Sequence, residues 1–173
     1  MIFHCSWDST AIIITIIYCI ILLVVIVGVF RTIMLFRKQK RTFLVWVNIV
    51  PIPLLLGILF IPALFTPLNV SVENESIRIN RIYRDIVIPI EDIEEIRVHR
   101  SSDTKNSIRT FGSGGAFGYL GKFKNAQLGN YQMFVTNRTQ KVLVRFNDQV
   151  LIFSCDEPNE IVNYVNERIS LID

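Results

Sequence analysis

Two long uncharged stretches occupy the first part of the chain. The first is a run of 20 residues from Ala11 to Phe30, dominated by Ile, Leu and Val, with Asp8 and Arg31 as the nearest charges. A helix rises about 1.5 Å per residue, so about 20 apolar residues cross a hydrocarbon core of about 30 Å. The run therefore predicts a transmembrane helix over residues 11–36, preceded by an N-terminal tail of residues 1–10.

The second uncharged stretch extends from Thr42 to Val72. It predicts a helix over residues 43–68 that returns across the membrane, with Trp46 near its basic end, where aromatic rings tend to sit at the headgroups. Two buried helices in a soluble protein are the alternative. Neither run is amphipathic, which argues against that alternative.

Basic residues around the connector predict the orientation. They gather in and beside a basic loop over residues 37–42, whereas the N-terminal tail has none. The positive-inside rule then places this loop in the cytoplasm and both termini on the opposite side. Arginines 78, 81 and 84, which follow the second run, favour the reverse orientation. The basic residues that flank the membrane are Arg31, Arg37, Lys38, Lys40 and Arg41, and each would also attract anionic lipid by about 1 kcal/mol.

Beyond Leu68 the pattern changes to the alternation that is typical of strands. In SVENESIRINRIYRDIVIPI, isoleucines alternate with polar residues, and turns are predicted at Asn74-Glu75 and Arg84-Asp85. Further strands are predicted by IEEIRVHR, NYQMFVTN, KVLVRF and QVLIFSC, with short polar connections between the later ones. The pattern predicts about seven antiparallel strands.

The last segment, CDEPNEIVNYVNERIS, changes to helical spacing. It predicts a helix over about 157–170, with Asp156 as its N-cap. A single amphipathic helix after a strand meander would most simply cover the open end of a barrel.

These segments carry a resemblance to a known family. The order of two spans, a strand meander and a terminal helix, together with IVIPIEDIEEIRV, GGAFGYLGKF and LGNYQMFVTN, resembles the bacterial pleckstrin-homology-like (PH-like) domain proteins anchored in a membrane. The resemblance covers Val70 to Ile169, and its most specific part runs from Gly114 to Tyr131. It implies a partly open, seven-stranded PH-like barrel over residues 69–173, closed by the C-terminal helix and held at the bacterial cytoplasmic membrane. The family has no catalytic residues and mostly no assigned ligand, and the phosphoinositide-binding signature of its eukaryotic relatives cannot be placed on this chain.

The glycine-rich stretch FGSGGAFGYLGKF does not match the patterns of nucleotide sites. A P-loop needs G-x-x-x-x-G-K-[ST], but Gly121-Lys122 is followed by Phe123, and Ala116 stands where the first glycine is required. The dinucleotide pattern would need glycine at position 117, which is Phe. We therefore expect bends and bulges of a sheet at these glycines, and no cofactor.

Charge is unevenly distributed in the predicted domain. Residues 104–147 contain seven basic and no acidic residues, whereas residues 69–173 together carry 13 basic and 14 acidic residues, a net charge of −1. A solvated basic strand face explains this pattern. The sharper hypothesis is that the four basic residues around the glycine-rich stretch contact an anionic surface beside the bilayer. Nucleic acid is a poor candidate, because the net charge is near zero and the spans restrict access. The four candidate contacts are Lys105, Arg109, Lys122 and Lys124.

Candidate catalytic and metal-binding residues are sparse. The two histidines are isolated, and the three cysteines show no paired spacing, so no metal site is predicted. Cys155 fits a core position of the last strand better than a nucleophile activated by His99. The acidic residues Glu91, Asp92, Glu94 and Glu95 fit a solvated turn and strand edge better than a cation site.

The sequence thus predicts a two-helix transmembrane hairpin followed by a mainly-β PH-like barrel with a C-terminal helix. Its predicted function is that of a membrane-anchored, non-catalytic interaction module that binds a protein partner or an anionic membrane surface. An accessory subunit of a larger membrane complex, with the spans as partner surface, is the alternative, and an enzyme is less favoured. The expected partners are membrane lipids and another membrane or membrane-associated protein.

Overall fold

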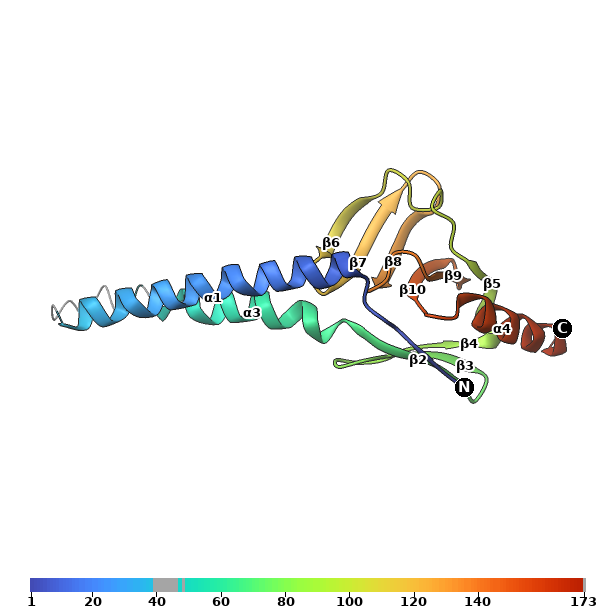
Figure 1. Cartoon of the computed structure of the whole chain (residues 1–173). Helices are drawn as coiled ribbons and strands as arrows, with labels where there is room; N and C mark the ends of the chain where they lie inside the picture. Colours follow the sequence, from blue (N-terminus) through green and yellow to red (C-terminus); the bar gives the residue numbers. More distant parts are fainter. Residues whose placement is uncertain (39–46, 48, 173) are drawn as a thin grey trace.

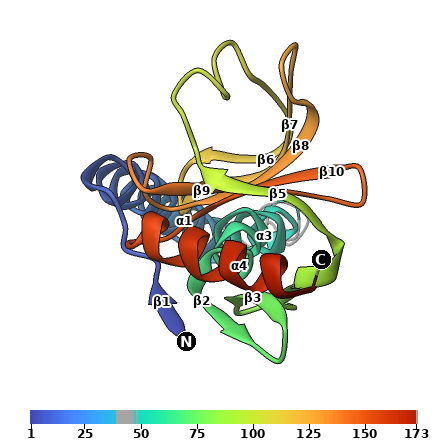
Figure 2. The same cartoon turned by 90° about the vertical axis from the view of Figure 1, so that its right-hand side faces the viewer.

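A long helical arm extends from one end of a β-rich domain (Figure 1). The structure is a computed structural model that describes residues 1–38, 47 and 49–172. The N-terminus and the C-terminal helix both lie with the β-rich domain (Figures 1 and 2).

The arm is formed mainly by helix α1, Ser9–Lys38. Its 30 residues correspond to about 45 Å, and most of its apolar side chains between Ile12 and Leu35 are exposed. Among the described residues it is the one helix long and apolar enough to cross a membrane. The N-terminal helix expected from the sequence is present. It starts earlier than expected, because Asp8 caps it.

The predicted second span is not supported as a full crossing. Helix α3, Pro51–Leu64, has 14 residues, or about 21 Å, against the roughly 30 Å of a hydrocarbon core. It lies beside α1, where the Tyr18 hydroxyl donates to the Ile58 carbonyl at 2.7 Å (Figure 1). The span cannot extend to residue 68, because the chain enters a strand at Pro67. Residues 43–46 and 48 of that prediction, and residues 39–42 of the basic loop, lie outside the described residues.

A four-stranded antiparallel sheet contains the N-terminus of the chain. Residues 2–4, expected to be part of an N-terminal tail, form an edge strand because Phe3 is buried in the core at 1% exposure. Asn74 and Glu75 both have positive φ, at 48° and 56°, as a tight hairpin of this kind requires, so the predicted turn is confirmed. The strand order is β1-β2-β3-β4, and the strands are β1 (Ile2–His4), β2 (Pro67–Glu73), β3 (Ser76–Arg81) and β4 (Ile86–Pro89).

A six-stranded sheet forms the rest of the domain and corrects the predicted seven-stranded antiparallel barrel. From Pro67 onward the described chain contains nine strands in two sheets, and β8 and β10 are parallel neighbours. The meander prediction assumed that successive strands are neighbours. Here the chain passes from β8 to β9, which is not its neighbour in the sheet. Strand β10 then occupies the position between β8 and β9. The order is β5-β9-β10-β8-β7-β6, with β5 (Ile93–Val98), β6 (Ile108–Gly115), β7 (Gly118–Asn125), β8 (Gly129–Val135), β9 (Lys141–Phe146) and β10 (Gln149–Ser154).

Helix α4, Pro158–Ile172, follows β10 as the sequence indicates and contacts β5 and the short helix η1, Ile90–Asp92. Its buried Ile161 and Val165 join the main core, which the two sheets share. Cys155 is fully buried in this core, as predicted. A smaller apolar cluster around Tyr131 and Ile152 lies on the other face of the six-stranded sheet.

Candidate functional site

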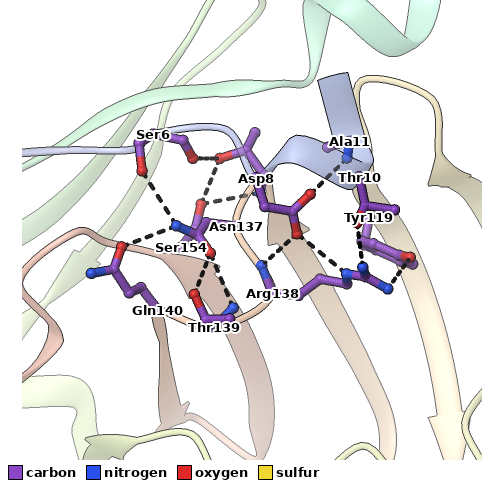
Figure 3. Close-up of polar contacts among 11 residues, drawn as sticks. Ser6, Asp8, Thr10, Ala11, Tyr119, Asn137, Arg138, Thr139, Gln140 and Ser154 are labelled. Carbon is purple, nitrogen blue, oxygen red and sulfur yellow. Dashed lines mark hydrogen bonds and ion pairs between the residues drawn. The ribbon is translucent and has the colours of Figure 1, made fainter. Parts of the chain in front are cut away.

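A polar junction joins the start of α1 to the β-rich domain (Figure 3). The Asp8 carboxylate accepts from the backbone N–H of Ala11 at 2.6 Å, and from the backbone N–H and Nε of Arg138 at 3.1 and 3.2 Å. Arg138 also donates from Nη2 to the Thr10 hydroxyl at 2.7 Å. Asp8 therefore caps the helix and binds the domain with the same side chain.

These contacts favour the ionised form of the Asp8 carboxyl. Burial alone would raise the pKa of its carboxyl. The hydrogen bonds from Ala11 and Arg138, with the charge of Arg138, outweigh burial and leave the pKa below its usual value. The ion pair is part of a larger network and is partly shielded, since the Asp8 side chain is only 16% exposed.

Two connections hold the chain around Ser6 and Asp8, the one between β8 and β9 and the one that follows β10. The Thr136 hydroxyl donates to the Ser6 carbonyl at 2.9 Å, and the Asp8 N–H donates to the Thr136 carbonyl at 3.1 Å. The Asp156 carboxylate accepts from the N–H and hydroxyl of Ser6 at 2.9 and 2.6 Å. Asp156, predicted as the N-cap of the last helix, therefore fixes the N-terminal segment instead.

The glycine-rich hairpin of β6 and β7 packs against α1. Between these strands, the Phe117 N–H donates to the Thr15 hydroxyl at 2.8 Å, and its ring makes edge contacts with Trp7 and Tyr18 at 6.4 and 6.2 Å. Gly115 allows the close approach, because a Cβ there would lie 3.1 Å from the Ile14 Cδ1 atom. The stretch thus serves packing, as the sequence indicated, and its partner is α1.

The four basic candidates of the sequence do not form one cluster. Lys124 and Lys122 stand opposite Ile108 and Phe111 in the β6–β7 ladder, so these four side chains share one face of the hairpin. Ile108 and Phe111 are 71% and 74% exposed. Arg109 pairs with Phe123 on the other face, and Lys105 lies in the loop before β6. We call the face formed by Ile108, Phe111, Lys122 and Lys124 the hairpin face.

A shallow cavity of about 280 Å³ lies on the opposite side of the sheet. Phe123, Tyr131 and Met133 are among its apolar lining residues, and Arg138 and Lys141 are its cations. Burial, together with the charge of Arg138, lowers the pKa of Lys141. Sequence reasoning missed this group, because its members come from separate strands and loops, and the only local signal was the basic excess of residues 104–147.

Cys155 and His99 do not have the properties of a nucleophile and its base. Burial raises the pKa of the Cys155 thiol to about 11, so the thiol stays protonated at neutral pH. His99 has a buried Nε2 atom without a hydrogen-bond partner in the described chain. Burial and the nearby Lys141 lower its pKa to about 4. Within the described ranges, no group of three or more His, Cys, Asp or Glu side chains is arranged to hold a metal ion.

Comparison with known proteins agrees with this architecture. Residues 68–169 match a family model described as a bacterial PH domain, and PH-like domains are generally non-catalytic. No curated protein and no solved structure matches the chain. The match covers β2 to α4 and more than half of the sequence, and therefore the chain belongs to the bacterial PH domain family.

Proposed function

We propose that this protein is a membrane-anchored, non-catalytic interaction module whose hairpin face contacts an anionic membrane surface. Helix α1 supplies the anchor, and the junction at Asp8 fixes the domain to it. The observation that carries the proposal is the hairpin face itself, where two exposed apolar side chains of β6 stand opposite two lysines of β7.

The hairpin face is uncovered. The loop before β6 packs on the other side of the sheet, where the Tyr131 hydroxyl and the Asn125 Nδ2 atom both donate to the Ser107 hydroxyl, at 2.7 and 3.1 Å. Neither Lys122 nor Lys124 takes part in an ion pair with a described residue. Both cations are therefore free to meet an external anion.

Apolar and basic side chains together suit the boundary of a bilayer. Apolar groups enter the headgroup region while each lysine gains about 1 kcal/mol from anionic lipid. The hairpin lies on the side of the domain from which α1 extends (Figure 1), and Phe117 holds its turn against that helix. This placement favours lipid over a soluble protein as the partner of the hairpin face.

Hydrogen exchange of the full-length protein in nanodiscs tests the proposal. With anionic lipid present, the amides of residues 108–113 should exchange more slowly than in purely zwitterionic discs. High salt should remove the difference, since it is electrostatic. The double change Lys122→Glu and Lys124→Glu should remove it as well. The control Arg100→Glu with Lys105→Glu, in the loop on the other side, should leave it in place.

The same exchange rates in both kinds of disc would refute the lipid contact. Protection of residues 108–113 only after addition of a membrane protein extract would support the protein-partner alternative. An unchanged response in the Lys122→Glu and Lys124→Glu variant would show that these lysines do not carry the interaction.

A further inference from the structure

We propose that the loop between β3 and β4 makes a second contact with the membrane. In this contact Ile82 and Tyr83 lie in the interfacial layer, near the end of α3. The inference rests on the proposed anchoring by α1, and it concerns residues that are separate from the hairpin face. The loop was recognised from the sequence only as a turn.

The tip of this loop is unusually apolar for an exposed turn. Ile82 and Tyr83 are adjacent and are 61% and 56% exposed. They are flanked by Arg81 and Arg84. A tyrosine has an apolar ring and a polar hydroxyl, which suits the boundary between hydrocarbon and headgroups, and arginine can pair there with phosphate.

Backbone and ring contacts fix the loop at the point where α3 ends. The Tyr83 N–H donates to the carbonyl of Leu64, the last residue of α3, at 2.9 Å. The Tyr83 ring makes an edge contact with Phe65, with the ring centres 5.7 Å apart. Figure 1 shows α3 running beside α1 away from the domain. If α1 crosses the bilayer, the end of α3 nearest the domain lies at its surface.

The loop is held rigid without the help of lipid. The Asp85 carboxylate accepts from the Arg81 N–H at 3.1 Å and from Arg78 Nη1 at 3.3 Å. Arg81 Nε donates to the Arg84 carbonyl at 3.0 Å. The Arg81 guanidinium lies over the Phe65 and Phe134 rings, 5.7 and 4.7 Å from their centres. Because the loop is already ordered, little conformational entropy is lost when its tip enters the membrane.

The two surfaces together would define the orientation of the domain. The hairpin turn contacts α1 through Phe117, and the β3–β4 loop contacts the end of α3 through Tyr83. With lipid contacts at both places, the domain would be held against the bilayer at two separated points. It would then present the same outer face, including α4, to other molecules.

Depth-dependent fluorescence quenching tests this contact in the full-length chain. Trp7 and Trp46 are first replaced by Phe, and the protein is placed in two sets of zwitterionic vesicles. Acyl chains brominated near the headgroup end serve the loop and α4 variants, and acyl chains brominated near the bilayer centre serve the α1 variant. Three single-tryptophan variants are compared. Tyr83→Trp probes the loop, Ile20→Trp probes α1, and Leu171→Trp is the control, since it is 85% exposed on α4 at the far end of the domain (Figure 1).

We expect quenching of Tyr83→Trp to exceed that of Leu171→Trp about two-fold or more, because interfacial side chains reach the boundary of the acyl chains. Adding Ile82→Asp should lower the quenching of Tyr83→Trp, because a carboxylate resists entry into the interface. Ile82→Trp is a second probe at an exposed position, in case the new ring in Tyr83→Trp disturbs the contact with Phe65.

The outcomes separate this inference from the proposed function. Quenching of Ile20→Trp without quenching of Tyr83→Trp and Ile82→Trp would overturn the loop contact and leave the membrane anchor in place. Quenching of none of these three would overturn the anchoring by α1 as well. Equal quenching of Tyr83→Trp and Leu171→Trp would also refute the proposal, since it would show no preferred orientation.

Discussion

Asp8 shows how much a single residue contributes to this structure. In the sequence it is only the charge that precedes an apolar run, whereas in the structure it caps α1 and pairs with Arg138. Sequence analysis could not connect the two, because they are 130 positions apart.

Replacing Asp8 should therefore loosen the junction between helix and domain. Asp8→Ala removes a helix cap, worth about 1 kcal/mol, and a partly exposed ion pair, worth about 0.2–1 kcal/mol. We expect Asp8→Ala to lower the free energy of unfolding by about 1–2 kcal/mol in total. Asp8→Asn should cost less, because its amide oxygen can still cap the helix. Unfolding midpoints in detergent measure both changes, and equal losses would argue against the capping contribution.

His99 should make stability depend on pH. In the folded chain the pKa of His99 is about 4, so the histidine is neutral near pH 7. Burial lowers this pKa most, and the charge of Lys141 lowers it further. Asp103 raises the pKa, and Arg97 lowers it. In the unfolded chain the pKa of His99 is about 6.5. As pH falls from about 6.5 toward about 4, the unfolded state binds a proton that the folded state does not, so stability falls.

The thermal midpoint measures this effect. For the native chain it should be lower at about pH 5 than at about pH 7.5, and His99→Gln should weaken that difference by removing the titrating group. An identical pH dependence in the native chain and in His99→Gln would contradict the assignment.

At the scale of elements, the β6–β7 hairpin depends on two glycines that face each other. Gly112 and Gly121 are paired in the ladder, with φ of 113° and 122°. A side chain at either would collide with the backbone of the facing strand, at the Leu120 or Phe111 carbonyl. The pattern of glycines indicated a bend or bulge, but only the pairing explains why both positions need glycine.

Gly121→Ala should therefore be costly. Backbone strain of about 1–3 kcal/mol and overpacking of similar size should together lower stability by about 3 kcal/mol. Gly129→Ala is the matched control. Its φ is 70°, and nothing lies within 4 Å of an added Cβ, so only about 1 kcal/mol of left-handed strain is expected. Comparison of unfolding midpoints tests this, and losses of equal size would show that the close approach has no energetic effect.

At the scale of the whole molecule, the N-terminal strand determines where the start of the chain lies. Because β1 pairs with β2, the start of the chain stays with the PH-like domain at one end of α1 (Figure 1). If the positive-inside rule holds for the basic residues at the other end of α1, the domain is outside the cytoplasm.

Thiol labelling of intact cells checks this orientation. In a Cys19→Ser background, Ser102→Cys places one exposed thiol in the loop before β6, whereas Cys5 and Cys155 are buried. A membrane-impermeant reagent should label this variant in intact cells. Labelling that appears only after lysis would place the domain in the cytoplasm and favour the charges of residues 78, 81 and 84 instead.

The sequence by itself determined the features that depend on neighbours along the chain. The apolar run from Ala11 identified the long helix, the spacing of Ile161 and Val165 identified the last helix, and Asn74-Glu75 identified a hairpin turn. In these cases hydrophobic periodicity and turn chemistry act over a few residues, so local patterns suffice.

Only the tertiary structure decided which distant segments meet. It placed residues 2–4 in a sheet, put β10 between β8 and β9, and divided the basic residues of the hairpin between two faces. It also set the β3–β4 loop against the end of α3. Strand partners and surface clusters depend on the burial of side chains that are far apart in sequence, and periodicity along the chain does not contain that information.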